Sequence, residues 1–196
     1  MDQFKTAIKD DDIDKALELK QEFDLDLKLA LFDAIRKDED LAIAMIENCQ
    51  RLTLSLTETN EDKLSNSQLL DELTPLMSAC QLKKPNIVKA ILCQVKTQDI
   101  AINARSGFDY TAFIFACENG CTAIVAMMLE MAQEVKIDLN AKDFMERTGF
   151  ILACKEKHSE VINLIMDKAE SLQIDLDCKD KDGKSGFDYY PEHFQK

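Results

Sequence analysis

Apolar positions in this chain fall into blocks that recur every 37 residues. The first block begins with threonine and ends with Ala-Cys, at 74–80, 111–117 and 148–154. A second apolar block follows in each unit, at 87–92, 124–129 and 161–166. A third marker, with Asn or Asp between an apolar residue and Ala or Cys, closes each unit at 102–104, 139–141 and 176–178. Three markers that keep the same phase predict structural repeats, each of them one supersecondary unit.

Each unit is predicted to hold two short helices followed by an extended connection. A threonine hydroxyl accepts from the free N–H groups of a first turn, so the first helices are expected to begin at Thr74, Thr111 and Thr148. The second block places apolar residues on a wide stripe that needs cover on two sides. Such a unit buries its core only against its neighbours, and the pattern therefore predicts an all-α solenoid.

The rest of the chain follows the same plan more loosely. Apolar periodicity predicts two further helix pairs, at about 3–26 and 27–73. The second pair carries an insertion at 51–72, which fits either a long loop or a short hairpin. At the other end, 185–196 begins a first helix with no second helix to follow, as is typical of a capping half-repeat. We therefore expect a single domain, 1–196, of about five units, with full repeats at 74–110, 111–147 and 148–184.

The turn before each first helix carries a family resemblance. Residues 143–153 and 180–185 follow the pattern D-x-x-G-x-T-P-L-H-x-A, and the second segment keeps both Asp180 and Gly183. The segment 160–165 matches E-V-V-x-L-L in the second helix. In these motifs the chain resembles the ankyrin-repeat family, which implies an ankyrin-repeat solenoid with a C-terminal half-repeat cap.

Departures from the ankyrin pattern predict local differences. The position of the family's histidine holds Met77, Ile114 and Ile151, so packing there is expected to be apolar. The glycine between the two helices survives only as Gly120. The first turn has Asp109 in place of glycine, and its shape is expected to differ from that of its neighbours.

The period of the repeat also departs from the family. It exceeds the usual 33 residues by four, or about one helical turn, inserted between the second helix and the third marker. We therefore expect second helices that run on through 131–134 and 169–172.

Composition and charge agree with a helical, acidic protein. The 196 residues include five glycines and three prolines, too few for a sheet-rich fold with many tight turns. The formal net charge is -13, of which residues 1–73 carry -10 and residues 74–196 carry -3. This imbalance argues against nucleic acid or an anionic membrane surface as the main partner. The acidic front is either a solvated cap or a ridge for a basic partner, formed by Asp10, Asp11, Asp12, Asp38, Glu39 and Asp40.

Two features bear on where the protein resides. The longest unbroken apolar run, 123–129, is far shorter than the roughly 20 residues of a membrane-spanning helix. Acidic residues crowd the start of the chain, which excludes a secretory signal and contradicts a mitochondrial presequence. A cytoplasmic protein is expected, with the nucleus as the alternative.

The seven cysteines are odd in number and lie mostly among apolar neighbours. Cys80, Cys117 and Cys154 share one repeat position, which favours reduced core residues. The four-residue spacings of Cys117 with Cys121 and of Cys154 with His158 leave a zinc site as the alternative. Core packing accounts for three cysteines at once and is the interpretation we adopt.

No other motif predicts a metal, a cofactor or a catalytic centre. The acidic stretch 177–183 resembles a calcium loop, but its first ligand position falls on Cys178 and its last on Tyr189. No nucleophile motif, phosphate loop or dinucleotide fingerprint accompanies the two histidines. We therefore expect no enzyme, no cofactor and no bound metal.

The family resemblance implies a non-catalytic protein–protein interaction module, acting as an adaptor or a masking inhibitor and monomeric when free. The alternative is a structural subunit of a larger protein assembly. Solenoids bind through a concave face and protruding turns. The predicted contact residues are aromatic, Met or basic side chains of those turns: Arg105, Phe108, Tyr110, Phe144, Met145, Arg147, Lys181 and Lys184. For Phe108 and Phe144, packing against their own turn is the alternative.

Overall fold

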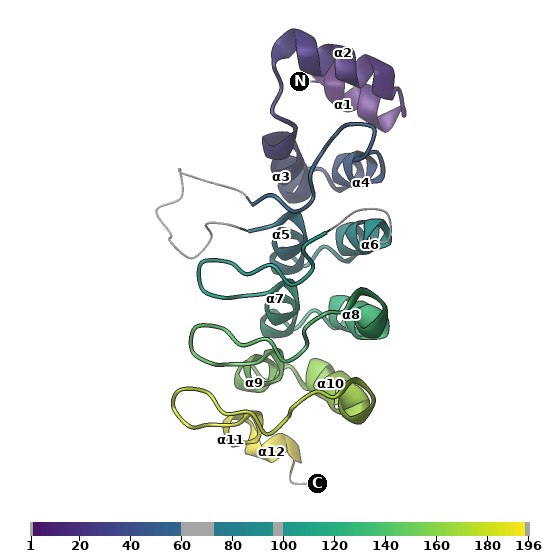
Figure 1. Cartoon of the computed structure of the whole chain (residues 1–196). Helices are drawn as coiled ribbons and strands as arrows, with labels where there is room; N and C mark the ends of the chain where they lie inside the picture. Colours follow the sequence, from purple (N-terminus) through teal and green to yellow (C-terminus); the bar gives the residue numbers. More distant parts are fainter. Residues whose placement is uncertain (1, 60–72, 96–99, 195–196) are drawn as a thin grey trace.

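The computed structural model describes residues 2–59, 73–95 and 100–194 (Figure 1). Within these residues the chain forms twelve helices and no β-strand. The helices follow one another in pairs: α1 (Asp2–Lys9) with α2 (Ile13–Phe23), α3 (Leu27–Lys37) with α4 (Glu39–Glu47), α5 (Pro75–Gln81) with α6 (Pro85–Gln94), α7 (Ala112–Glu118) with α8 (Thr122–Val135), α9 (Gly149–Lys155) with α10 (Ser159–Leu172), and α11 (Gly186–Tyr189) with α12 (Pro191–Phe194). No described helix is long and apolar enough to cross a membrane.

The helix pairs stack into two columns. The first helices α3, α5, α7, α9 and α11 contact one another in order, and the second helices α4, α6, α8 and α10 form a parallel column beside them (Figure 1). The turns that precede α7, α9 and α11 project past the first-helix column (Figure 1). The predicted all-α repeat solenoid is thereby confirmed.

Helix starts and inter-helix turns repeat the same local chemistry. The hydroxyls of Thr74, Thr111 and Thr148 each accept from the backbone N–H three residues on, at 3.3 Å. The turn between the paired helices contains one residue in the left-handed region, with φ of 55° at Lys83, 66° at Gly120 and 60° at Lys157. Threonine caps thus set the helix starts as predicted, and the inter-helix turn keeps its shape with or without glycine.

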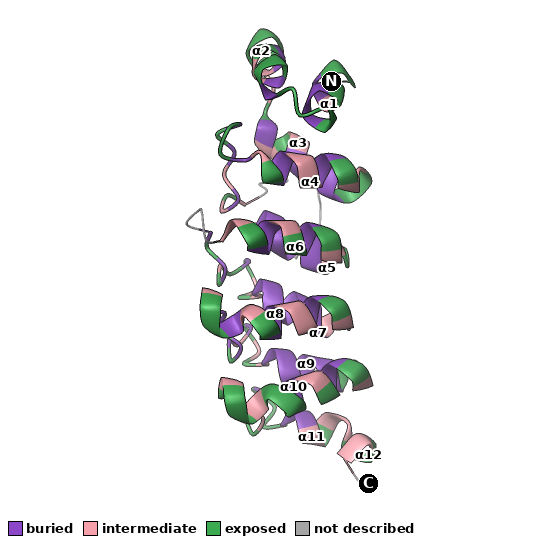
Figure 2. Cartoon of the chain, turned by 90° about the vertical axis from the view of Figure 1, so that its right-hand side faces the viewer, coloured by how far each residue is buried: buried purple, intermediate pink, exposed green. Residues whose placement is uncertain are grey.

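One large apolar core runs through the stack, and Ile114, Ala141 and Leu152 form a small second cluster beside it. The three positions that lack the family's histidine, Met77, Ile114 and Ile151, are at most 1% exposed. Cys80, Cys117 and Cys154 are fully buried, so burial raises the pKa of each thiol. In Figure 2 each long helix is purple along the side facing its neighbours and green or pink elsewhere, as expected for amphipathic helices. The cysteines therefore act as core side chains.

The later second helices have the predicted extra turn. Helices α8 and α10 each have 14 residues and end at Val135 and Leu172. Each is followed by a left-handed cap residue, with φ of 56° at Lys136 and 54° at Gln173. Helix α6 has ten residues, and residues 96–99 beyond it lie outside the described part of the chain.

Asparagine side chains tie those left-handed caps to the preceding repeat. Asn103 donates to the Lys136 carbonyl at 2.8 Å and accepts from Asp138 N at 2.8 Å. One repeat later, Asn140 donates to the Gln173 carbonyl and accepts from Asp175 N, both at 2.9 Å. An amide can do both with one side chain, because it carries a donor and an acceptor. These asparagines thus serve as helix C-caps supplied from the neighbouring unit.

Replacing Asn140 by alanine should lower the free energy of unfolding by about 1 kcal/mol, since two exposed hydrogen bonds to the next repeat are lost. Hydrogen exchange at Gln173 and Ile174 should accelerate because the end of α10 loses its cap. The matched variant Asn140→Asp keeps the acceptor and loses the donor, so we expect an intermediate effect. Urea unfolding of the three chains measures this, and an unchanged Asn140→Ala variant would contradict the capping role.

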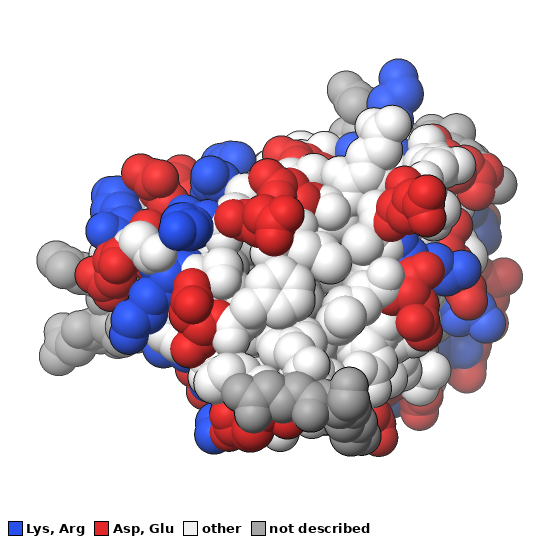
Figure 3. All heavy atoms as spheres, turned by 90° about the horizontal axis from the view of Figure 1, so that it is seen from below, with Lys and Arg blue, Asp and Glu red and all other residues white. Residues whose placement is uncertain are grey.

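Both ends of the stack depart from the sequence-based expectations. Helix α1 packs against α2 and α4, so it continues the second-helix column and not the first (Figure 1). At the other end, the prediction that no second helix follows is wrong, because Pro191 opens the one-turn helix α12. Phe194 of α12 packs its ring 4.7 Å from that of Phe187. Figure 3 shows this C-terminal end as an uncharged area with acidic side chains at its edge.

The predicted insertion lies partly in the described chain. Residues 51–59 form turns and irregular segments, with Leu52, Leu54 and Leu56 buried in the core. The remainder, 60–72, lies outside the described residues, so the choice between loop and hairpin stays a prediction. The apolar side chains at its start explain why residues 51–59 stay attached to the stack.

Candidate partner-binding surface

Three protruding turns, at 106–111, 143–148 and 180–185, share one backbone shape. The fourth residue of each lies in the left-handed region, with φ of 61° at Asp109, 62° at Glu146 and 75° at Gly183. Its N–H donates to the carbonyl of the first residue of the turn at 2.8 to 2.9 Å. The expectation that the Asp109 turn differs in shape is therefore wrong. The same hydrogen bonds close every turn, and an acidic residue adopts the strained conformation where glycine is missing.

The first side chain of each turn also closes it from inside. Asp143 Oδ1 accepts from the N–H groups of Met145 and Arg147, at 2.9 and 2.8 Å. Asp180 Oδ1 accepts from the two equivalent N–H groups, each at 3.0 Å. Ser106 Oγ makes one such bond, to Tyr110 N at 3.2 Å. The turns are therefore held in place before any partner arrives.

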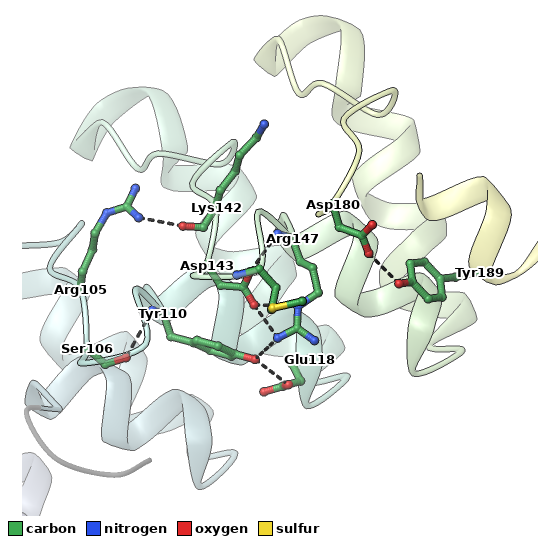
Figure 4. A network of polar contacts seen from close by, with 10 residues as sticks. Arg105, Ser106, Tyr110, Glu118, Lys142, Asp143, Arg147, Asp180 and Tyr189 are labelled. Atoms are coloured by element: carbon green, nitrogen blue, oxygen red, sulfur yellow. Dashed lines mark hydrogen bonds and ion pairs between the residues drawn. The ribbon is translucent and has the colours of Figure 1, made fainter. Parts of the chain in front are cut away.

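Neighbouring turns are joined to one another. Phe144 N donates to the Phe108 carbonyl at 3.2 Å, and Lys181 N donates to the Met145 carbonyl at 3.0 Å. The Arg105 guanidinium donates to the Lys142 carbonyl at 2.8 Å (Figure 4). These bonds link three repeats along one edge. The turns 106–111, 143–148 and 180–185, with Arg105 beside the first, therefore present their side chains as a single row, which we call the turn row.

Phe108 and Phe144 form an aromatic pair across two turns. Their ring centroids lie 5.3 Å apart in an edge-to-face arrangement. Phe144 is 42% exposed, among the most exposed large apolar residues of the described chain. The rings pack on each other between turns, and Arg147 also lies 6.0 Å over the Phe144 ring. The structure thus brings together two aromatic residues that belong to separate turns in the sequence.

Tyr110 and Arg147 are used inside the protein. Arg147 donates from Nε to Asp143 Oδ2 at 2.7 Å and from Nη2 to the Tyr110 hydroxyl at 3.2 Å (Figure 4). The Tyr110 hydroxyl donates in turn to Glu118 Oε1 at 3.0 Å. The Asp143 side chain is completely buried and that of Arg147 is 14% exposed. These two predicted contact residues therefore hold the turn row against helix α7.

Burial and charge explain the pKa shifts in this polar network. Burial, together with the neighbouring Glu118 carboxylate, raises the pKa of Tyr110 well above its ordinary value. Burial disfavours the charged form of Arg147, but its hydrogen bond and ion pair with Asp143 outweigh this and raise its pKa. Arg147 is thus fixed as a cation and Tyr110 as a neutral hydrogen-bond donor at neutral pH.

The last turn presents its basic side chains to solvent. Lys181 and Lys184 are exposed, and Lys184 Nζ lies 5.3 Å from the centroid of the Tyr189 ring. Tyr189 donates its hydroxyl to Asp180 Oδ2 at 2.6 Å, and this bond raises the pKa of Tyr189 to about 12. Burial opposes ionisation of Asp180, but the hydroxyl and the turn N–H groups outweigh it and lower the pKa of that carboxyl.

The Tyr189→Phe variant should lose stability in a pH-dependent way. The folded pKa of Tyr189 lies above its ordinary value of 10, so its contribution is complete below pH 10 and disappears as pH rises toward 12. Urea unfolding of both chains between pH 7 and about 11 tests this. The difference in unfolding free energy should be constant at first and then shrink. A difference that does not change with pH would contradict the hydrogen bond to Asp180.

The acidic residues near the start of the chain have structural partners. Asp12 and Asp38 cap α2 and α4 through the N–H groups of Lys15 and Leu41. Asp38 also pairs with Lys9 at 2.9 Å. Salt bridges to Asp11 and Glu39 come from Arg51 and Lys84, at 3.6 and 3.5 Å. These salt bridges compensate part of the charge of the predicted acidic ridge, whereas Asp10 and Asp40 are exposed. Binding of a basic partner by this ridge stays a prediction.

The residues weighed as metal ligands have other roles. In the part of the chain that the structure describes, no group of three or more His, Cys, Asp or Glu side chains lies together as a metal site would require. His158 Nε2 lies 2.8 Å from the Glu118 carbonyl, which ties two repeats together. The Asp180 carboxylate closes its own turn, as described above.

The sequence analysis did not predict Asp143 as the partner of Arg147 or Glu118 as the partner of Tyr110. One signal was present, because Tyr110 and Arg147 occupy the same repeat position 37 residues apart and so lie on adjacent turns. The four-residue spacing of Asp143 and Arg147 across one turn was a second signal.

Stacked helix pairs joined by hydrogen-bonded turns define this molecule as a helical-repeat solenoid. The family model described as ankyrin repeats, in three copies, matches residues 31–143 and 76–182. The chain belongs to the ankyrin-repeat family. Ankyrin repeats are generally protein–protein interaction modules and are typically non-catalytic. No curated protein matches the chain.

Proposed function

We propose that this protein is a non-catalytic adaptor or masking inhibitor that binds a partner protein through its turn row and concave face. The observation that carries the proposal is the Phe108–Phe144 pair, with its exposed Phe144 ring, on turns that are already fixed. Aromatic side chains on a rigid frame bury large areas with little ordering cost, which is typical of interface hot spots. Arg105, Met145, Lys181 and Lys184 border the pair along the row.

The proposal also covers the class of partner, the compartment and the oligomeric state of the free protein. The partner is expected to be a protein, because the net charge of -13 disfavours nucleic acid and anionic membranes. Residence in the cytoplasm or nucleus and a monomeric free state belong to the proposal. Sedimentation of the purified chain tests the free state. A chain that aggregates unless coexpressed with a neighbour would favour a fixed subunit of an assembly.

The binding proposal is tested with Phe144→Ala and a matched control. Met166→Ala removes a side chain of similar exposure, 38%, from helix α10. Tagged wild-type and variant chains are used to copurify partners, which are identified by mass spectrometry and then measured by calorimetry. We expect the Phe144→Ala variant to lose affinity about tenfold or more, while Met166→Ala binds normally. If every copurifying protein survives both Phe144→Ala and Phe108→Ala, the turn row is not the binding surface.

A further inference from the structure

The first-helix column is open at its N-terminal end. Helices α3, α5, α7, α9 and α11 follow one another in this column, whereas α1 packs over α4 in the neighbouring column (Figure 1). The face of α3 that points away from α5 is therefore not covered in the way that each later first helix is covered. A pocket of about 310 Å³ lies at this place, between α1 and α3.

Apolar side chains form much of this pocket. Phe4 of α1 and Leu41 of α4 meet Leu29, Ala30 and Ala34 of α3 there. Leu29 is 56% exposed, although it lies in a helix whose other leucines are buried. One exposed leucine is common on protein surfaces, so the significance of Leu29 depends on the apolar surface that continues beside it.

The apolar surface continues onto helix α2. A second pocket is lined by Phe4, Leu19 and Phe23, so the two pockets adjoin at Phe4. Phe23 is 56% exposed, as exposed as Leu29. We call the site lined by Phe4, Phe23, Leu29, Ala30 and Ala34 the N-terminal groove; Phe23 and Leu29 are its exposed side chains, and Phe4 and Ala34 lie buried at its floor.

The charges around the N-terminal groove are unevenly compensated. Asp33 pairs with Lys37 at 2.6 Å, and Asp38 pairs with Lys9 at 2.9 Å. At the other end, Glu22, Asp24 and Asp26 form no salt bridge within the described chain, although Glu22 interacts with Lys15 over a longer distance and Lys5 lines the pocket with Asp26. This end is therefore acidic and adjoins the exposed Phe23 and Leu29.

We propose that the N-terminal groove binds an amphipathic helix of a partner protein, with its apolar face on α3 and basic residues toward Glu22, Asp24 and Asp26. A helix fits because each later first helix is covered by another helix of the column. Its basic end complements carboxylates that form no salt bridge within the described chain. This is the helix-in-groove mode of recognition, and its surface is separate from the turn row.

The probe for this proposal is a labelled synthetic helix of about 16 residues, long enough to be partly helical alone. It carries leucine on one face and lysine at one end, and a second peptide carries glutamate in place of lysine. Binding is measured by fluorescence anisotropy. The lysine peptide should bind the wild-type chain at least about tenfold more tightly than the glutamate peptide does. Equal binding of the two peptides would overturn the proposed role of the acidic end.

Two substitutions with equal charge change test the groove against non-specific attraction. Leu29→Lys blocks the groove, and Leu82→Lys adds the same charge at a 41% exposed leucine in another repeat. We expect affinity for the lysine peptide to fall at least about tenfold in Leu29→Lys and to change little in Leu82→Lys. Equal affinities for these two variants would overturn the proposal. Both sites are exposed, so both variants should fold.

The acidic end is tested with a triple variant, Glu22→Gln, Asp24→Asn and Asp26→Asn. Asparagine still caps α3 at position 26 and tolerates the left-handed φ of 48° at position 24. Its control removes three exposed carboxylates elsewhere, through Glu130→Gln, Asp167→Asn and Glu170→Gln. Binding of the lysine peptide should weaken only in the first variant, and equal weakening in both would overturn the charge assignment.

Two further measurements distinguish a partner helix in the groove from a second copy of the chain and from binding at the turn row. If the wild-type chain sediments as a dimer that Leu29→Lys dissociates, the groove binds a second copy, and the proposed partner helix is wrong. The Phe144→Ala variant should bind the lysine peptide normally, and a loss there would also contradict a separate surface. Failure of the turn row and failure of the groove are therefore distinguishable.

Discussion

Replacing Arg147 by alanine is expected to lower the free energy of unfolding by about 3 kcal/mol, because a buried carboxylate loses its counter-ion. The Arg147 guanidinium contacts Asp143 Oδ2 through both Nε and Nη2, at 2.7 and 2.6 Å. The Asp143 side chain has no solvent exposure. Two backbone N–H groups still hold its other oxygen, which keeps the expected loss near the lower end of the range for broken buried pairs.

Two comparisons, Arg105→Ala and a double variant, show whether this loss comes from the ion pair. Arg105→Ala removes a 43% exposed arginine from the preceding turn and should cost less than about 1 kcal/mol. The double variant Arg147→Ala with Asp143→Asn removes both charges while asparagine can still accept from the turn, so part of the loss should be recovered. Urea unfolding at pH 7 measures all of them. A double variant as unstable as the sum of the two single variants would show that the pair is not coupled.

Partner binding by the Arg147→Ala variant distinguishes a residue that supports the turn row from one that contacts the partner. The Tyr110 hydroxyl would lose the Arg147 donor, and the Phe144 ring would lose the guanidinium beside it. Partner binding by Arg147→Ala is therefore expected to weaken through a disordered turn row. In contrast, Phe144→Ala is expected to weaken binding with a smaller loss of stability than Arg147→Ala, because Phe144 is 42% exposed and loses a ring contact and not a buried ion pair.

The repeated elements of the fold could be predicted because their causes are local or periodic. Thr74, Thr111 and Thr148 cap helices through bonds made three residues away, and the extra turn of α8 and α10 follows from the length of the period. The core position of Cys80, Cys117 and Cys154 follows from its recurrence. Such features need only the spacing within one unit, which the sequence displays directly.

The site was predicted less well because its residues depend on neighbouring repeats. An arginine in an exposed turn has the same local sequence whether it meets a partner or a buried aspartate. Arg147 is internal because Tyr110 and Asp143 lie on its two sides, and that arrangement arises only after stacking. Likewise, Asp109 adopts a glycine-like φ because the turn hydrogen bonds outweigh a local cost of about 1–2 kcal/mol. The position of α1 over α4 also has no local signal.

Replacing Gly120 by alanine is expected to lower the free energy of unfolding by about 2–3 kcal/mol, through backbone strain and a steric clash. Gly120 has a φ of 66°, which an L side chain adopts only at a cost. A Cβ there would lie 2.6 Å from His158 Cγ and Cε1 and still closer to Nδ1. The ring would have to move, which breaks its 2.8 Å contact with the Glu118 carbonyl.

At the equivalent position of the preceding repeat, Lys83, the reverse substitution to glycine is expected to raise the free energy of unfolding. Lys83 has a φ of 55° and is exposed, so Lys83→Gly relieves strain and should raise the unfolding free energy by about 0.5 kcal/mol, after the greater freedom of glycine in the unfolded chain is counted. In the double variant Gly120→Ala with His158→Ala the clash is absent. The double variant should therefore be less stable than His158→Ala only by the backbone strain at position 120. Lys83→Gly measures the same kind of strain independently. If Gly120→Ala costs no more than that strain, the His158 ring moves freely, and the contact between the two repeats contributes nothing to stability.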